Sequence, residues 1–313
     1  MGNNSVPVKR VTMSRLAILS FALFSLATLL IAPSYAAKRT LGDESVIVWF
    51  DSPLENSARE VLKVYPAIRV ELMTALGWRT AFRPEIVLIK DSTSFRRVAD
   101  SDLVTALAVP QKNLIMIDSS KMNDHPFTLE TTLKHELCHL ELHHHIAESE
   151  LPRWFDEGIC QWVTGGLSEI MTESNHSILR EAALSNRLIS IEGLAETFPA
   201  DGRDLLLAYD ESRSIVEYIE KQFGASAVRK ILEQMSRGDN LEIAIRKSIL
   251  ISLDELEKRW KSSISEKASW FSYIGSNLYE ILFLFAALMS IYGFFVILKK
   301  KRAYKDEEDP EER

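Results

Sequence analysis

Two histidines and a glutamate in one short segment have the types and spacing of a metal-dependent hydrolytic site. Residues 135–139 read H-E-x-x-H, with His135, Glu136 and His139 as the polar members. Residues four apart share one face of a helix, so the two histidines can bind one metal ion. Glu136 then lies beside that ion, where it can take a proton from a bound water. Because a five-residue pattern also occurs by chance, its surroundings have to support it.

The two histidines leave the third ligand to be identified, because a hydrolytic zinc site has three protein ligands and one open position. The sequence offers two candidates for it. His145 has the spacing of the metzincin motif H-E-x-x-H-x-x-G-x-x-H, but Leu142 stands where that motif has a turn-forming glycine. Glu157 is the other candidate. Pro152 suits the first turn of a helix, and Glu157 would project from the second turn. Two antiparallel helices joined by a short loop can bring Glu157 to the histidines, which favours Glu157 over His145.

Residues 151–158 read L-P-x-W-F-x-E-G, and with the preceding H-E-L-x-H they resemble the gluzincin zinc metallopeptidases, in particular the peptidase MA-like family. The segments AYDES (208–212), YIEKQFG (218–224) and LDELEKRW (253–260) also match elements of that family in their order. The resemblance covers most of residues 38–270. It implies an α+β fold of the thermolysin-like, two-lobe kind, with a small N-terminal mixed sheet and a helical C-terminal half.

The resemblance also implies what the site residues do. His135, His139 and Glu157 would bind one Zn²⁺, and Glu136 would be general base and later proton donor in peptide-bond hydrolysis. The substrate would be a protein or peptide, added in extended form to an edge strand at residues 113–117. The alternative function is a catalytically silent, zinc-containing binding or assembly module of the cell envelope. The intact Glu136 argues against it, because a structural site needs no base.

Two further roles follow from the resemblance. The oxyanion of the tetrahedral intermediate needs a donor, and Tyr209 is the first choice, with Tyr218 and His176 as alternatives. A zinc-binding histidine donates its free N–H to an oxygen acceptor. Many gluzincins have an acid four residues after the glutamate ligand, where this sequence has Gln161. Either the amide oxygen of Gln161 or the carboxylate of Asp156 would then accept that bond.

The remaining cysteines and histidines near the motif have less specific interpretations. Cys138 and Cys160 are the only cysteines. They would pair in an oxidising compartment, but two small buried side chains behind the site are slightly favoured. Neither is expected to be a ligand, since Cys138 points about 60° away from His135 on an ideal helix. The run 143–145, three histidines, is expected to form a solvated loop rather than a metal-recruiting cluster.

Hydrophobic periodicity predicts strands first and helices afterwards. The buried face of the first helix is expected to consist of Ala58, Val61, Leu62, Tyr65, Ile68, Leu72 and Leu76. Ser92 or Ser94 is expected to cap the short second helix. The expected strands are 45–50, 85–89, 103–109 and 113–117, the last two joined as a hairpin by residues 110–112. The expected helices are 56–76, 92–98, 128 onward, 151–164, 175–186, 205–223, 225–235, 241–250 and 252–263.

Both ends of the chain carry membrane signals. Residues 1–37 are typical of a signal peptide, because basic residues precede the apolar run 16–32 and Ser34-Tyr35-Ala36 is a small-x-small cleavage site. The alternative is an uncleaved anchor. Near the other end, residues 274–298 are predicted to form a transmembrane helix, since their apolar run of about 20 residues matches the hydrocarbon thickness of a bilayer.

The charges around this second apolar run predict an orientation. Lys299-Lys300-Lys301-Arg302 follow it directly, so residues 299–313 are expected to be a cytoplasmic tail. Residues 38–270 would then be a peptidase domain outside the cytoplasm, periplasmic or extracellular, held to the inner membrane by one span. The net charge is −7 and no basic stripe occurs, so a nucleic-acid partner is not expected.

Overall fold

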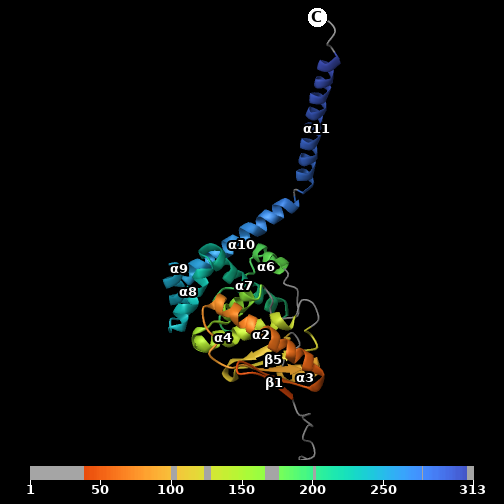
Figure 1. Ribbon diagram of the computed structural model, residues 1–313. Helices are drawn as coiled ribbons and strands as arrows, with labels where there is room; N and C mark the ends of the chain where they lie inside the picture. Colours follow the sequence, from red (N-terminus) through yellow and green to blue (C-terminus); the bar gives the residue numbers. More distant parts are fainter. Residues whose placement is uncertain are drawn as a thin grey trace, which may run out of the picture.

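The computed structural model describes residues 39–99, 104–122, 128–165, 176–199, 202–276 and 278–308 (Figure 1). A five-stranded sheet forms one layer, and helices cover it and continue into a helical half. The strands are β1 (Arg39–Gly42), β2 (Ile47–Phe50), β3 (Glu85–Ile89), β4 (Ala106–Val109) and β5 (Leu114–Asp118). The helices are α2 (Glu55–Leu76), α3 (Ser92–Ala99), α4 (Leu129–His145), α5 (Arg153–Val163), α6 (His176–Leu184), α7 (Gly202–Phe223), α8 (Ala225–Ser236), α9 (Leu241–Ile249), α10 (Leu253–Ser276) and α11 (Leu278–Glu308).

The sheet is mixed, with the order β1-β2-β3-β5-β4. β2, β3 and β5 run parallel in its centre, and β1 and β4 pair antiparallel at its two edges. Val48, Ile86 and Ile115 lie opposite one another in register and are fully buried. Their β-branched side chains suit a strand that is covered on its face. The expected mixed α+β fold is therefore confirmed, and β1 is a strand that the periodicity did not predict.

The expected edge strand is wrong. Residues 113–117 correspond to β5, which lies between β3 and β4, and the edge nearest the HExxH helix is β4. The turn explains the order: Pro110–Lys112 form a short 3-10 helix, and Asn113 adopts a left-handed φ of 49°. The chain therefore folds back antiparallel, as the predicted hairpin requires, and β4 covers the outer side of β5.

Helix α2 spans the sheet and packs against β2 and α4 (Figure 1). Six of the seven residues predicted for its buried face are buried, and Leu62 is half-buried. Gly77 ends the helix with a φ of 88° and donates its N–H to the Met73 carbonyl at 2.9 Å. This left-handed cap favours glycine, because a side chain there would strain the backbone. The serines expected to cap α3 do not do so: Asp91 accepts the N–H of Ser94 instead.

The helical half follows the predicted helices closely. α7, α8 and α9 begin and end within a few residues of expectation, and Ser252 caps α10 by accepting the N–H of Glu255 at 3.2 Å. α10 continues to Ser276, beyond its expected end, so the last apolar helix begins at Leu278 rather than at residue 274.

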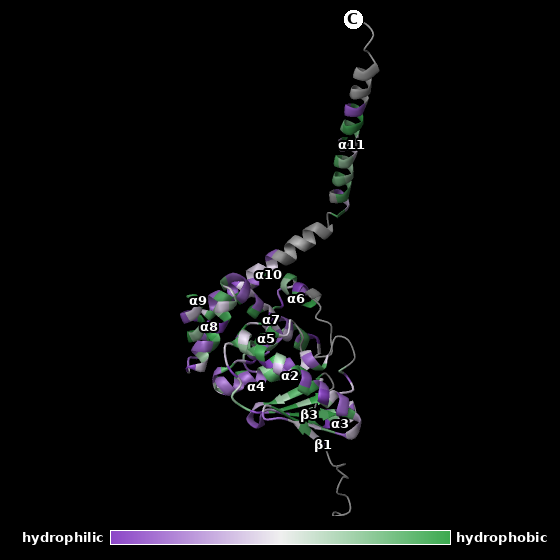
Figure 2. Ribbon diagram, viewed as in Figure 1, coloured by the Kyte–Doolittle hydropathy of each residue, from purple (hydrophilic) through white to green (hydrophobic). Residues whose placement is uncertain are grey.

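Helix α11 is the one helix among the described residues that is long and apolar enough to cross a membrane, over Leu278–Lys300. Its apolar side chains are exposed, and Figure 2 shows it extending away from the sheet and the other helices. An exposed apolar surface of this length marks a site of contact with a membrane or with another protein. The predicted signal peptide, residues 1–37, lies outside the described residues.

Candidate active site

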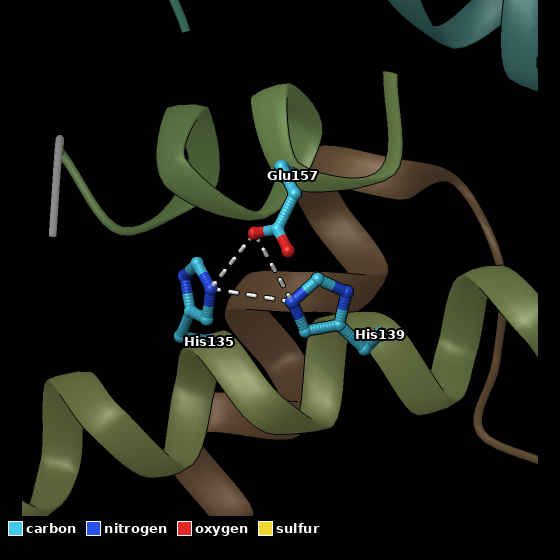
Figure 3. Close-up of side chains that lie close together, drawn as sticks. All are labelled: His135, His139 and Glu157. Atoms are coloured by element: carbon cyan, nitrogen blue, oxygen red, sulfur yellow. Dashed lines mark hydrogen bonds and ion pairs between the residues drawn. The ribbon is translucent and has the colours of Figure 1, made fainter. Parts of the chain in front are cut away.

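His135, His139 and Glu157 converge between α4 and α5 (Figure 3). The two histidines are one helical turn apart, and their Nε2 atoms are separated by 3.2 Å. Oε2 of Glu157 lies 3.7 Å from the Nε2 atom of each histidine. All three side chains are buried, and their ligand atoms lie within 4.8 Å of one another. Two imidazole nitrogens and one carboxylate oxygen at these separations have the dimensions of a three-ligand metal site.

The N-terminus of α5 is fixed by a neighbouring loop. Pro152 precedes the first turn and has no N–H to satisfy. Arg153 donates its N–H to the Ala195 carbonyl at 2.9 Å, and Trp154 donates to the Leu194 carbonyl at 3.2 Å. These bonds satisfy backbone donors that the first turn of a helix leaves free. The direction of α5, and hence the position of its second turn, is set by these contacts.

Gly158 allows α5 to lie against α7. A Cβ at this position would lie 2.5 Å from the Ser212 carbonyl oxygen and 2.9 Å from Cγ2 of Val216. The hydroxyl of Ser212 does not obstruct the contact, because it donates to the Ala208 carbonyl of its own helix at 2.7 Å. The Glu-Gly pair therefore has two separate tasks: Glu157 faces the histidines, and Gly158 permits the close approach behind it.

Asp156 forms hydrogen bonds with His139 and His143, which lie one helical turn apart on the cleft side of α4. Its Oδ1 lies 2.8 Å from Nδ1 of His139, and its Oδ2 lies 3.0 Å from Nε2 of His143. A carboxylate can only accept, so His139 donates through Nδ1 and turns Nε2 towards Glu157. Of the two acceptors considered from the sequence, Asp156 makes this bond. Gln161 instead donates its amide N–H to the Tyr209 carbonyl at 3.1 Å.

The electrostatics of the cluster favour a positive charge at its centre. Burial lowers the pKa of His139, but the carboxylates of Asp156 and Glu157 outweigh it, and the pKa lies well above its ordinary value. Burial lowers the pKa of His135. Burial opposes ionisation of Asp156, yet His139 beside it holds the pKa of that carboxyl below its usual range. The two carboxylates would stabilise either a proton on His139 or a metal ion bound to its Nε2 atom.

Tyr209 reaches the same cluster from α7. Its side chain is buried, and its hydroxyl donates to Oε1 of Glu157 over 3.4 Å. The ring packs edge-on against Phe198, with the ring centroids 5.1 Å apart. Of the two alternatives for the oxyanion donor, Tyr218 packs against the hydrophobic core, and the side chain of His176 is outside the described part of the structure.

The three consecutive histidines are part of α4 and do not form a loop, contrary to expectation. Leu142 is fully buried within the helix, which continues to His145. The ring of His145 stacks on Trp78 at a centroid distance of 4.5 Å, and that of His144 lies 5.0 Å from Phe82. His145 is therefore held by a tryptophan and does not join the ligand cluster.

His143 is the residue of this site that the sequence interpretation missed. It contacts Asp156 and lines the cleft beside Glu136. The spacing could have predicted its place, because His143 follows His139 by four residues and so lies on the same face of the helix.

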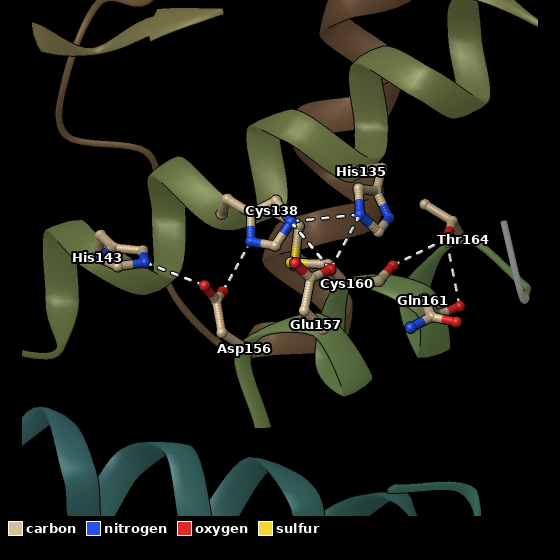
Figure 4. The surroundings of a disulfide bond; sticks show 9 residues. His135, Cys138, His143, Asp156, Glu157, Cys160, Gln161 and Thr164 are labelled. Carbon is tan, nitrogen blue, oxygen red and sulfur yellow. Dashed lines mark hydrogen bonds and ion pairs between the residues drawn. A yellow bond between two sulfur atoms is a disulfide. The ribbon is translucent and has the colours of Figure 1, made fainter. Parts of the chain in front are cut away.

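Cys138 and Cys160 form a disulfide bond, so the slightly favoured expectation of two unpaired buried cysteines is wrong (Figure 4). Both residues are fully buried, with their Cα atoms 5.5 Å apart. Cys138 lies between the two histidines on α4, and Cys160 follows Glu157 by one helical turn on α5. The bond crosses directly between the helices that carry the ligand cluster.

An open cleft of about 630 Å³ gives access to the cluster. Its walls come from the edge strand β4, the turn after it, α4, the segment before α5, the first turns of α5, and the loop that contains Ala195 and Glu196. The lining residues are Leu107, Ala108, Pro110, Gln111, Glu136, His139, His143, Glu148, Ser149, Leu151, Pro152, Arg153, Asp156, Glu157, Ala195 and Glu196. Glu136 is only 1% exposed, so its carboxylate lies at the bottom of the cleft, next to the histidines.

Comparisons with known proteins identify the family. The model of the Peptidase MA superfamily matches residues 93–266, which is more than half of the chain. No curated protein matches the sequence. Among solved structures, that of Legionella pneumophila aminopeptidase A in complex with aspartic acid is similar at 14% identity and a TM-score of 0.40. That similarity covers 71% of this chain and 27% of the aminopeptidase chain. The family match includes both helices that carry His135, His139 and Glu157, and the chain is a peptidase that belongs to the Peptidase MA superfamily.

Proposed function

We propose that this peptidase is a zinc enzyme in which His135, His139 and Glu157 hold one Zn²⁺. The donor set supports the proposal, because two imidazole nitrogens and a carboxylate are ligands of catalytic zinc sites. Oε2 of Glu157 is buried and has no hydrogen-bond partner among the described residues. A buried carboxylate oxygen without a partner is costly, and a cation between the three side chains would satisfy it.

When bound, Zn²⁺ would act as a Lewis acid towards the scissile carbonyl and lower the pKa of a coordinated water. Glu136 is the general base in this proposal: it accepts the proton of the attacking water and later delivers it to the leaving amine. Its position at the bottom of the cleft supports this role. Tyr209 is proposed as the donor to the oxyanion, since its hydroxyl already lies beside Glu157.

The substrate in this proposal is a protein or peptide in extended form. β4 is an edge strand, and its residues Leu107 and Ala108 line the cleft that contains Glu136. The free edge of a strand can pair with an added peptide through backbone hydrogen bonds, while pockets receive alternate side chains. This replaces the pairing with residues 113–117 that the sequence suggested. A thermolysin-like arrangement of two lobes about this cleft is part of the same proposal.

We further propose that the peptidase acts outside the cytoplasm, tethered to the inner membrane by α11. The disulfide supports an oxidising compartment, because such bonds are rare in the cytosol. Lys299, Lys300, Lys301 and Arg302 at the end of the apolar stretch favour a cytoplasmic tail, 299–313, by the positive-inside rule. Residues 1–37 would be the signal peptide, and 38–270 the exported peptidase domain.

The observation that carries the proposal is the convergence of His135, His139 and Glu157 at the cleft that Glu136 lines. Its test is Glu136→Gln in the full-length protein, purified in detergent. We expect the variant to retain about one zinc per chain while kcat on a peptide substrate falls by about 10²- to 10⁴-fold, the usual contribution of a general base. Glu148→Gln removes another carboxylate of the same cleft and should leave kcat nearly unchanged.

Two results would refute the proposal. A Glu136→Gln protein with wild-type kcat would remove the proposed base, and a wild-type protein that binds no zinc would remove the cofactor. With the base removed and the cleft intact, Glu136→Gln should also retain substrates. Capturing and sequencing the bound chains would then identify what the enzyme cleaves.

A further inference from the structure

The cystine occupies a particular place relative to the ligand cluster. Cys138 is on α4 between His135 and His139, and Cys160 is on α5 one turn after Glu157 (Figure 4). Two of the three ligand candidates share a helix, so helix geometry alone fixes their separation. Glu157 belongs to a different helix. Its distance from the histidines therefore depends on how α5 is held against α4.

Two connections hold these helices together at the site. Asp156 bonds to His139 and His143 on the cleft side of Glu157, and the cystine joins the helices on the other side, at Cys160. The first connection is made of hydrogen bonds to one carboxylate that lines the open cleft. The second is covalent and fully buried. Glu157 lies between them, so its carboxylate is constrained from both directions along α5.

We propose that Cys138 and Cys160 are positioning residues of the metal site, and that their disulfide holds Glu157 at the distance from His135 and His139 that metal binding requires. The inference rests on the proposed zinc function. A site whose ligands are already in place binds its metal without first ordering a helix, so the affinity is higher. The cystine holds the ligands in place by linking the two helices that carry them, and it does not itself contact the metal.

The bond also determines what the sulfur atoms can do. Sγ of Cys160 lies within 4.8 Å of ligand atoms of His139 and Asp156. A free thiolate at that place would be a strong zinc ligand. In the cystine the sulfur has no thiolate form, so this second set of ligands does not compete with the His-His-Glu cluster. The disulfide thus fixes one ligand set and excludes another.

The test compares the wild type with two double variants of the full-length protein, all produced by export so that the disulfide forms in the wild type. Cys138→Ala/Cys160→Ala removes the bond and some volume, whereas Cys138→Val/Cys160→Ala removes the bond while restoring most of that volume. The measurements are the Zn²⁺ dissociation constant, by competition with a chelator, and the visible absorption of the Co²⁺-loaded protein. Val228→Ala, a buried change in α8 remote from the site, controls for a general loss of stability.

We expect both double variants to bind Zn²⁺ about 10- to 100-fold more weakly, the range found when residues that orient metal ligands are removed. Their Co²⁺ absorption should change in position and intensity, because the third ligand is displaced. Val228→Ala should match the wild type in both measurements.

The outcomes separate this inference from the function on which it rests. If the wild type binds Zn²⁺ and the volume-restoring variant binds it equally well with an unchanged Co²⁺ spectrum, the disulfide is only packing and the inference is overturned. If the wild type itself binds no Zn²⁺, the proposed function fails and the inference fails with it. Weaker binding in Val228→Ala would also overturn the inference, since the loss would then reflect stability and not the position of Glu157.

Discussion

Oδ1 of Asp156 lies 2.8 Å from Nδ1 of His139, so the residue before Glu157 orients His139. The contact links α5 to α4 and selects the imidazole tautomer that leaves Nε2 free for a metal. Because Asp156 and Glu157 are adjacent, rotation of α5 would move both carboxylates at once. The geometry of the cluster therefore depends on the packing of one helix.

Asp156→Asn should weaken zinc binding by about 10- to 100-fold, because the amide lacks the charge that holds the N–H of His139. Isothermal or chelator-competition titration of the purified protein measures the effect. Glu196→Gln is the matched control, since Glu196 lines the same cleft without contacting a histidine. Equal zinc affinity of Asp156→Asn and the wild type would contradict the orienting role.

Tyr209→Phe should lower kcat by about 10²-fold or more, the usual cost of losing an oxyanion donor. Zinc affinity should change by less than about tenfold, because the hydroxyl is 3.4 Å from Glu157, a long hydrogen bond. Tyr218→Phe, a change at a partly buried position against the core, should leave both quantities unchanged. The opposite pattern, with zinc lost and kcat per bound zinc preserved, would make Tyr209 a positioning residue for Glu157.

Gly158→Ala should destabilise the fold by about 1–3 kcal/mol, the typical cost of overpacking a tight contact. The added methyl would meet the backbone carbonyl of Ser212, which has no rotamer to change. Urea denaturation followed by circular dichroism gives the free energy of unfolding. Gly202→Ala is the control, because a Cβ there meets nothing within 4 Å. If the two variants were equally stable, the close approach of α5 and α7 would not depend on glycine.

Local patterns in the sequence were sufficient to predict the helices and the convergence of His135, His139 and Glu157. The i, i+4 spacing places His135 and His139 on one face, and the Pro-led second helix predicted that Glu157 would come next to them. Both expectations depend on residues close together in the chain, where helix geometry determines the result. The structure brings these three residues together.

Most of the errors concern partners that are distant in the sequence. The histidines 144 and 145 are held in the helix by Phe82 and Trp78, more than 60 residues earlier, and no local pattern predicts those contacts. The edge strand was misassigned for a related reason: β-branched residues predict a strand but not its lateral neighbours. The disulfide required knowing the distance between α4 and α5, which the sequence alone does not provide.

Glu211 is a buried acid that the proposed mechanism does not use, and it predicts how stability varies with pH. It lies on α7 with 0% exposure, and its Oε1 accepts the N–H of Ile189 at 3.0 Å. Burial raises the pKa of Glu211 to about 8, although the Ile189 N–H opposes the shift. Among its charged neighbours, Lys261 lowers the pKa, whereas Glu257 and Asp210 raise it.

The sign of the effect follows from where the proton is held. In the unfolded chain the carboxyl has its ordinary pKa of 4.5, so between that pH and about 8 the folded state keeps a proton that the unfolded state releases. The contribution of Glu211 to stability is complete below pH 4.5 and is lost as the pH rises through 8.

Glu211→Gln keeps the acceptor for Ile189 but cannot ionise. The variant should therefore unfold at higher urea than the wild type at pH 8.5, and the difference should shrink towards pH 5. Glu192→Gln, an exposed change in the same loop as Ile189, should follow the wild type at every pH. Parallel stability curves for Glu211→Gln and the wild type between pH 5 and 8.5 would show that Glu211 is ionised in the folded protein.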